Sequence, residues 1–465
     1  MAQTKDPVNA EDTASVLAGI EGQSVRTGAP LSGVFQVPGD KSMSHRAILF
    51  GALAHGTTTV TGLLEGEDVL RSAAVMRALG AEIECDRTQT PNEWTITGPI
   101  ARGSEGAPIS CYFGNAGTGV RLAMGLVAGR GRAAWFDGDA SLRSRPMRRI
   151  LDPLAQMGVV AGDEEGRLPV VMEANSGLNA IDYRLPVASA QIKSAILLAG
   201  LGAQGTTRIE EPVRSRDHTE NMLKAFGVQL TIDEMEEGGR VLSLEGGQQL
   251  TAAQIEVPGD PSSAAFPIAA ALIVPGSDIT LPGIMMNPLR TGLFETLLEM
   301  GADLTYSNER VAGGEQIADI RVRHRPLNGV SVPAARAPAM IDEYPILAVI
   351  AAFAKGQTRM EGIGEMRVKE SDRIHAMEIG LKDNGVRVEC GPDWLSVSGS
   401  VDEGGTVGGG ARVATYHDHR IAMSFLCLGL GARAPVRVDD MSMIATSFPE
   451  FVTKMDGIGA SIVAR

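Results

Sequence analysis

The stretch VPGDKSMSHR, residues 37–46, opens an apolar helical segment, residues 47–54, that Gly56 ends. A helix N-terminus carries about half a positive charge, so a basic side chain in the first turn costs a few tenths of a kcal/mol, up to about 1. Lys41, His45 and Arg46 depart from this rule together. An anion bound at the helix N-terminus would reverse the sign of the effect. The stretch therefore predicts an anion site, against the alternative of a solvated run of surface charge.

The composition predicts two or three globular domains in a chain of 465 residues. Hydrophobic residues make up 44% and charged residues 21%, which is ordinary for a soluble protein. The formal net charge is −14, whereas a nucleic-acid-binding protein normally shows the opposite balance. We therefore expect no nucleic-acid partner. A basic cluster in such an acidic chain indicates a local anion site.

The cysteines and the apolar runs predict a cytoplasmic protein. The four cysteines are far apart and form no CxxC pair, which argues against a zinc site and a disulfide framework. No run of 18 apolar residues is present, so we expect no membrane span. Residues 1–29 carry no secretory signal pattern. We expect these residues to form a flexible N-terminal extension, with a short helix possible over residues 13–20.

A sixfold repeat organises the chain. Six helix-like segments end in glycine and pass into a strand, as expected of left-handed helix stops. A second series of six small-residue-rich apolar helices precedes them, and each unit of roughly 75 residues is too long for a solenoid repeat. The stops are Gly80, Gly158, Gly227, Gly301, Gly385 and Gly459. The second series begins near Ser42, Gly117, Ala190, Ser262, Asp342 and Asp418.

The join between two sets of three units is marked by a repeated tetrapeptide. VPGD occurs at residues 37–40 and again at 257–260, each time before a helix. We interpret the copies as two chain crossings between domains. The predicted architecture is α/β, with a flexible segment, 1–29, and one domain of three repeats over 40–257. Residues 30–39 join 258–465 in a second domain of three repeats.

Basic residues recur at the starts of the predicted helices, so a cleft shared by these ends would be strongly positive and would suit a ligand with several negative charges. The glycine-rich segment GNAGTG, residues 114–119, could bring backbone N–H groups to an oxyanion. Asp342 and Glu370 lie near cations and could act as acid or base. No HExxH, GxGxxG or Ser-His-Asp elbow is present, so a metal, a dinucleotide and a covalent nucleophile are unsupported. The basic residues are Lys41, Arg121, Arg145, Lys193, Arg216, Arg367, Lys369, Arg373 and Arg420.

Ten segments spread in order over both halves carry a resemblance. They are PGDKSMSHRA, GNAGTGVRL, SRPMRRILDPL, ASAQIKSAILLAGL, SRDHTENML, PGDPSSAAF, IDEYPILAV, RVKESDRI, DHRIAMSF and ATSFPEF. From about residue 30 the chain resembles the 5-enolpyruvylshikimate-3-phosphate (EPSP) synthase family, and several segments resemble its bacterial class II branch. The resemblance implies the enolpyruvyl transferase fold: two similar domains, each of three βαβαββ-type repeats, with helix N-termini facing an interdomain cleft.

The resemblance also implies the reaction. The enolpyruvyl group of phosphoenolpyruvate moves to the 5-hydroxyl of shikimate 3-phosphate and phosphate is released, in a pathway toward aromatic amino acids. No metal and no cofactor are implied, and we expect a monomer whose only partners are these small molecules.

Carried over residue by residue, the resemblance assigns Asp342 as the base for the 5-hydroxyl, Glu370 as the proton donor to the methylene carbon, and a share of proton transfer to Lys41. The residues implied for shikimate 3-phosphate are Lys41, Ser42, Arg46, Ser189, Gln191, Arg216, Asp342 and Lys369. Those implied for phosphoenolpyruvate are Lys41, Gly117, Arg145, Gln191, Arg373 and Arg420.

The sequence departs from the family pattern at three places. Ser447 runs directly into Phe448, where class I members carry a lysine, and Leu122 stands where many carry proline. Glyphosate-insensitive class II members carry alanine where this chain has Gly117, so we hypothesise an unobstructed, inhibitor-sensitive phosphoenolpyruvate pocket.

Three alternatives remain from the residues. An enolpyruvyl transferase acting on UDP-N-acetylglucosamine would need a loop cysteine in a matching motif, and none is present. An RNA 3′-phosphate cyclase-like protein would favour a basic chain. A sugar-phosphate-binding protein without catalysis would keep the cations but would not need Asp342 and Glu370.

Overall fold

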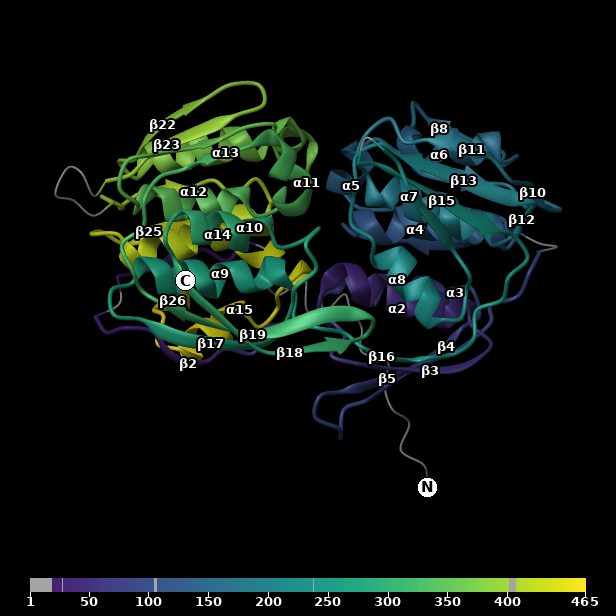
Figure 1. The fold of residues 1–465 in the computed structure, drawn as a ribbon, viewed down its shortest axis with the longest axis horizontal. Helices are drawn as coiled ribbons and strands as arrows, with labels where there is room; N and C mark the ends of the chain where they lie inside the picture. The colour runs from purple at the N-terminus through teal and green to yellow at the C-terminus, as the bar shows by residue number, and fades with distance from the viewer. Residues whose placement is uncertain (1–18, 27, 104–106, 237, 401–406) are drawn as a thin grey trace.

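The computed structural model describes residues 19–465 except 27, 104–106, 237 and 401–406. Its elements form two groups side by side, joined near α2, α9 and the strands below them (Figure 1). The predicted short helix over 13–20 falls almost entirely outside the described residues. Within those residues, no helix is long and apolar enough to cross a membrane.

Six four-stranded sheets of one topology make up the two groups in the part of the chain that is described. In each sheet an edge strand pairs parallel with its neighbour, and two antiparallel pairings follow. The first three sheets, in strand order, are β16 (Gln254–Glu256), β3 (Gly56–Thr61), β5 (Glu93–Gly98), β4 (Glu82–Asp86); β6 (Ile109–Tyr112), β7 (Ala134–Asp137), β9 (Arg167–Met172), β8 (Ala161–Glu164); and β11 (Asp182–Arg184), β13 (Thr206–Glu211), β15 (Arg240–Glu245), β14 (Thr231–Glu234).

The second group repeats the pattern. Its sheets are β2 (Ser32–Val34), β17 (Asp278–Met285), β19 (Glu315–Arg323), β18 (Asp303–Ala312); β20 (Ser331–Val332), β21 (Gln357–Met360), β23 (Leu395–Ser398), β22 (Arg387–Cys390); and β24 (Arg412–Val413), β25 (Val436–Val438), β1 (Gly22–Ser24), β26 (Ile462–Ala464). A two-stranded parallel ladder, β10 (Leu178–Asn179) with β12 (Ala203–Gln204), lies beside the helix α7 (Ala190–Gly200).

The strand β1 corrects one expectation. Residues 22–24 fall inside the segment 1–29 that we expected to be flexible, but all three are buried and pair antiparallel with both β25 and β26. The sixth sheet takes its third strand from this distant part of the chain. A pairing partner some 400 residues away cannot be read from three residues of local sequence.

The two helix series are confirmed by the structure. The apolar helices begin within two residues of their predicted starts, and the six glycine stops have φ between 82° and 106°. The apolar series is α2 (Lys41–Leu53), α4 (Gly117–Gly129), α7 (Ala190–Gly200), α9 (Pro261–Ile273), α12 (Tyr344–Ala352) and α14 (His419–Gly431). The glycine-stopped series is α3 (Glu67–Ala78), α6 (Arg148–Gln156), α8 (His218–Ala225), α10 (Gly292–Glu299), α13 (Arg373–Asp383) and α15 (Phe451–Gly457). Short helical turns are α5 (Ala140–Ser144), η1 (Ala334–Arg336), α11 (Ala337–Met340), η2 (Gly364–Val368) and η4 (Ser442–Thr446).

Two separate hydrophobic clusters form around the apolar helices, which are hydrophobic on all sides and therefore buried. One cluster draws its residues from 43–257 together with Met285. The other draws them from 264–462 together with Leu31 and Phe35. We propose on this basis that 40–257 is one domain and that 30–39 with 258–465 is the other.

The two VPGD copies pair with each other at the junction. Gly39 and Gly259 form an antiparallel bridge. The Asp40 N–H donates to the Pro258 carbonyl at 2.8 Å, and the Asp260 N–H donates to the Pro38 carbonyl at 2.9 Å. The crossings therefore lie side by side, and each aspartate starts a helix, α2 or α9.

Replacing Gly39 by alanine tests this junction. A Cβ atom at Gly39 would lie 1.9 Å from the Gly62 carbonyl oxygen, so the backbone of one crossing must move. We expect Gly39→Ala to lower the free energy of unfolding by about 1–3 kcal/mol or more. The matched control is Gly162→Ala, where the added Cβ meets nothing within 4 Å. Equal urea midpoints for the two variants would contradict the close approach.

Candidate active site

A cavity of about 420 Å³ lies where the N-terminal ends of all six apolar helices meet. Each helix contributes residues of its first turn or a residue one or two positions before it, so the partial positive charges of six helix ends face one space. These contributions are Lys41 and Ser42, Gly117 and Thr118, Ser189 and Ala190, Asp260 and Ser262, Asp342, and His419 and Arg420. Residues from both groups of sheets therefore build the cavity.

Cations outnumber carboxylates on the cavity wall. Eight Lys or Arg residues and five Asp or Glu residues line it, although the whole chain has a net charge of −14. His419 adds no charge, because burial and then the charges of Lys41 and Arg420 hold its pKa well below its usual value. The basic residues are Lys41, Arg121, Arg145, Arg149, Arg216, Arg290, Lys369 and Arg420, and the acidic residues are Asp68, Asp260, Asp342, Glu365 and Glu370.

Eleven of the thirteen residues that we predicted for the site line this one cavity. They are Lys41, Ser42, Gly117, Arg145, Ser189, Gln191, Arg216, Asp342, Lys369, Glu370 and Arg420. Arg373 lies directly behind the wall and contacts two of them. Arg46 is also behind the wall, where its guanidinium donates to the Ser42 carbonyl at 2.9 Å. The structure thus brings the predicted residues together, while their individual roles remain predictions.

Asp342 is surrounded by cations from both domains. Its carboxylate accepts from Arg216 at 2.8 Å and from Arg373 at 3.2 Å, and Lys369 Nζ lies at 3.5 Å. Burial raises the pKa of Asp342, but the charges of Lys369, Arg420, Arg216 and Arg373 together hold it well below its usual value. The group is therefore a carboxylate in this structure.

Glu370 shares Arg373 with Asp342. One carboxylate oxygen accepts from Arg373 Nη2, and the other lies 3.6 Å from Arg145 Nη1 of the opposite domain. Burial raises the pKa of Glu370, but the charges of Arg373, Arg145 and Lys369 together hold it well below its usual value. Its proton affinity therefore depends on how strongly these cations are engaged elsewhere.

The glycine-rich segment and α7 face each other across one side of the cavity. Gln191 accepts from Arg121 at 2.8 Å and donates to Thr118 at 3.1 Å. Arg145 donates to Asn115, and a Cβ at Gly117 would lie 2.9 Å from Arg145 Nη1. Glycine at position 117 therefore leaves room for this guanidinium.

Two of the basic residues in the opening stretch do not face the cavity, which corrects the simple interpretation of that stretch. His45 is fully buried with Nδ1 2.8 Å from Ser72 Oγ, and burial, with the charges of Lys41 and Arg46, lowers its pKa to about 3. It is neutral at pH 7. Arg46 also donates to Thr219 and Ser194, so only Lys41 brings its charge to the cavity wall from this turn.

Lys193 is a second correction. We counted it among cations at helix starts, but it is completely buried in an ionic cluster with Glu211 at 2.9 Å and Glu220 at 2.7 Å. Arg240 bonds the same two carboxylates. Lys193 is the fourth residue of α7 and points into the domain, whereas Gln191 points into the cavity.

Several cavity residues were missed by the sequence reasoning. Asp68 forms an ion pair with Lys41, and Arg149 pairs with Glu365 of the other domain at 3.4 Å. An aspartate in the first turn of a helix is the ordinary preference, so Asp68 gave no signal. Arg290 lies two residues before α10, just as Arg216 lies two residues before α8, so its position at a helix start was a signal that we overlooked.

Comparison with known proteins fits this architecture. The family model described as EPSP synthase (3-phosphoshikimate 1-carboxyvinyltransferase) matches residues 25–455. A 3-phosphoshikimate 1-carboxyvinyltransferase of Methylobacterium sp. (strain 4-46) is 55% identical over 442 residues, covering 94% of this chain and 97% of the relative. One from Caulobacter vibrioides is 54% identical over 440 residues, with 94% and 97% covered. The solved EPSP synthase of Acinetobacter baumannii has a TM-score of 0.82 at 41% identity, covering 96% of this chain and 100% of that chain.

Two groups of three units with one strand topology, with six helix N-termini meeting at one cationic cavity, define an enolpyruvyl transferase. The chain belongs to the EPSP synthase family. The predicted family, fold and enzyme class, a 3-phosphoshikimate 1-carboxyvinyltransferase of the shikimate pathway, are thereby confirmed.

His45 gives the folded protein a stability that depends measurably on pH. Its pKa is about 3 in the folded chain against an ordinary 6.5, so between these values only the unfolded chain binds the proton. The contribution of neutral His45 to the free energy of unfolding is fully present above pH 6.5. Below pH 6.5 this contribution decreases by about 1.4 kcal/mol for each pH unit. Between pH 7.5 and pH 5 the parent should lose about 2 kcal/mol more than His45→Gln in urea unfolding.

The same substitution at His55, an exposed residue, controls for the general effect of removing a histidine. Parallel stability curves for the parent and His45→Gln over this range would show that His45 is not buried in its neutral form.

Proposed function

We propose that this cavity transfers the enolpyruvyl group of phosphoenolpyruvate to the 5-hydroxyl of shikimate 3-phosphate by addition followed by elimination. One observation carries the proposal: two partly buried carboxylates, Asp342 and Glu370, share the guanidinium of Arg373 inside a wall of cations. The cations suit two polyanionic substrates. The carboxylates supply a base and an acid at adjacent positions, which a protein that only binds sugar phosphates would not need.

In the addition step, Asp342 takes the proton of the 5-hydroxyl while that oxygen bonds to C2 of phosphoenolpyruvate. Glu370 gives a proton to the methylene carbon, which becomes a methyl group. In the elimination step Glu370, now a carboxylate, takes a proton back from the methyl group, the C2–O bond to phosphate breaks, and the double bond forms again. The proton that Asp342 took from the 5-hydroxyl leaves with the phosphate. The fixed cations stabilise the phosphate charge throughout both steps.

The charge balance of the cavity supports Glu370 as a donor once phosphoenolpyruvate is bound. In this structure Arg373 and Arg145 hold the pKa of Glu370 low. A phosphate or carboxylate bound to the same two guanidinium groups offsets their charge at Glu370. Its pKa then rises toward the range in which a carboxylic acid transfers protons efficiently.

The binding roles that we propose are those that the family resemblance implies. We assign shikimate 3-phosphate to Lys41, Ser42, Arg46, Ser189, Gln191, Arg216, Asp342 and Lys369. We assign phosphoenolpyruvate to Lys41, Gly117, Arg145, Gln191, Arg373 and Arg420. The cross-domain pair of Arg216 with Asp342, at 2.8 Å, supports a substrate that lies between the domains and contacts both. Arg46 would reach the substrate only after leaving its present partners, Thr219 and Ser194.

Gly117 bears on inhibition. A methyl group at this position would be 2.9 Å from Arg145 Nη1 and would displace a guanidinium that we assign to phosphoenolpyruvate. The absence of a side chain at residue 117 therefore supports a pocket that glyphosate can enter.

We also propose that the enzyme acts as a monomer in the cytoplasm. Both walls of the cavity come from one chain, so no second copy is needed to complete it. The four cysteines are free thiols, which suits a reducing compartment.

Glu370→Gln tests the assignment of the proton donor. The amide keeps the size of the side chain but cannot deliver the proton, so we expect kcat to fall by about 10²–10⁴. The KM for shikimate 3-phosphate should change little. Steady-state phosphate release measures both. The control is Glu378→Gln, which removes a carboxylate that pairs with Lys382 at 2.7 Å and does not line the cavity. Near-normal kcat in Glu370→Gln would overturn the assignment.

A further inference from the structure

Arg290 occupies a central position at the junction of the two domains. It lies in the turn between β17 and α10, and its side chain is only 2% exposed. Its Nη1 donates to Asp40 at 2.7 Å, and its Nη2 donates to Asp260 at 2.9 Å and to Ser262 Oγ at 3.0 Å. One guanidinium therefore bonds the aspartates of both VPGD copies.

Each of these aspartates also starts a helix. Asp40 accepts from the Met43 N–H at 2.7 Å and caps α2, and Asp260 accepts from the Ser262 N–H at 2.8 Å and caps α9. The residues that follow Asp40 directly are Lys41 and Ser42, both on the cavity wall. The orientation of α2 relative to the second domain is thus fixed at the point where α2 meets the cavity.

The electrostatics require a forked cation at this place. Burial and the neighbouring charge of Asp40 raise the pKa of Asp260 to about 6, and Arg290 opposes both effects. Burial also raises the pKa of Asp40, but the charge of Arg290 holds it well below its usual range. A lysine would supply the charge but not the planar pair of donors that reaches two carboxylates at once.

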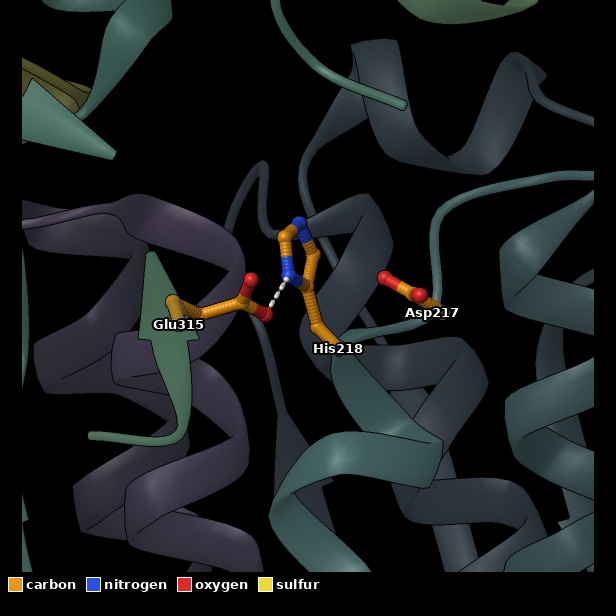
Figure 2. Close-up of side chains that lie close together, drawn as sticks. All are labelled: Asp217, His218 and Glu315. Carbon is orange, nitrogen blue, oxygen red and sulfur yellow. Dashed lines mark hydrogen bonds and ion pairs between the residues drawn. The ribbon is translucent and has the colours of Figure 1, made fainter. Parts of the chain in front are cut away.

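Neighbouring contacts extend the junction to the loop that carries Arg216. Asn287 donates to Asp217 at 2.7 Å and to Glu315 at 2.9 Å, and His218 Nδ1 lies 2.8 Å from Glu315. Figure 2 shows Glu315 approaching His218 from β19 on one side, with Asp217 on the other.

The three side chains of Figure 2 are close enough to hold a metal ion, but their present partners oppose that interpretation. His218 Nδ1 faces Glu315, and its Nε2 lies 3.3 Å from Arg290 Nη1, so a cation on the imidazole would lie against a guanidinium. The set is better explained as part of the domain junction.

A second chain of contacts leads from Arg290 to the opposite wall. Ser262 Oγ, which accepts from Arg290, donates to Glu343, and Arg420 Nη1 lies 3.4 Å from Glu343. The same Arg420 nitrogen donates to the Asp342 carbonyl at 3.1 Å. Arg290 is therefore linked to Lys41 on one side and to Arg420 on the other.

We propose that Arg290 is a positioning residue for the reaction: by bonding Asp40 and Asp260 together it holds Lys41 and Ser42 at a fixed place relative to Asp342 and Arg420. The proposal rests on the roles that we assign to these four residues under the proposed function. A displacement of about 1 Å between reacting groups is enough to cost about 10²-fold in rate.

The test compares Arg290→Met and Arg290→Lys in the full chain. We expect kcat/KM for shikimate 3-phosphate to fall about 10²-fold in both, because both lose the fork. The thermal midpoint should fall in Arg290→Met, which leaves two buried carboxylates without a cation, and should recover largely in Arg290→Lys. The control is Arg321→Met, which breaks an exposed two-donor pair with Asp278 at 2.9 and 2.6 Å and should keep the parent kcat/KM.

The lysine variant makes the test decisive. Parent-like kcat/KM in Arg290→Lys would overturn the proposal, because the charge alone would then be sufficient. If Arg290→Met does not fold, Arg290→Lys alone tests the proposal. A thermal midpoint close to that of the parent together with a reduced kcat/KM would support the positioning role. If the thermal midpoint and kcat/KM both recovered to the same extent in Arg290→Lys, Arg290 would have only a structural role, and the proposal would be overturned as well.

Lys41→Met, assayed beside these variants, distinguishes a failure of the proposed function from a failure of the positioning role of Arg290. Parent-like activity in Lys41→Met would contradict the proposed function itself. Loss of activity in Lys41→Met with parent-like activity in both Arg290 variants would contradict only the positioning role.

Discussion

The convergence of six helix N-termini on one cavity is the constraint on which the rest of this structure depends. Six partial positive charges face the same space, and eight Lys or Arg residues line it as well. Such a concentration of positive charge inside an acidic chain is stable only if carboxylates or bound anions compensate it. Asp342, Glu370 and Asp68 provide part of that compensation in the protein itself.

These carboxylates are more than counterions, because they lie where substrate anions would compete for the same cations. Arg373 bonds both Asp342 and Glu370, and Arg145 and Arg216 reach them from the other domain. Anions that engage these guanidinium groups change the proton affinity of both carboxylates. Anion binding and acid–base chemistry are therefore coupled through one set of charges.

The repeated pattern of the sequence was sufficient to predict the architecture. The glycine stops and the VPGD copies each depend on local backbone chemistry, and local chemistry is visible in sequence. Residues 22–24 joined a sheet with β25 and β26 because of a long-range pairing, which three residues cannot indicate. Lys193 and Gln191 both belong to the first turn of α7, yet one points into an ionic cluster and the other into the cavity. Packing decides which side of a helix faces the cavity, and packing also brings Arg290 to both aspartates. Residue spacing in the sequence predicts neither.

The central claim is that this cavity joins phosphoenolpyruvate to shikimate 3-phosphate. The most direct measurement is the release of inorganic phosphate from phosphoenolpyruvate by the purified chain, with and without shikimate 3-phosphate. We expect release only when shikimate 3-phosphate is present, with one enolpyruvyl group transferred for each phosphate. Release without this acceptor, release only with UDP-N-acetylglucosamine, or no release with both substrates present would contradict it.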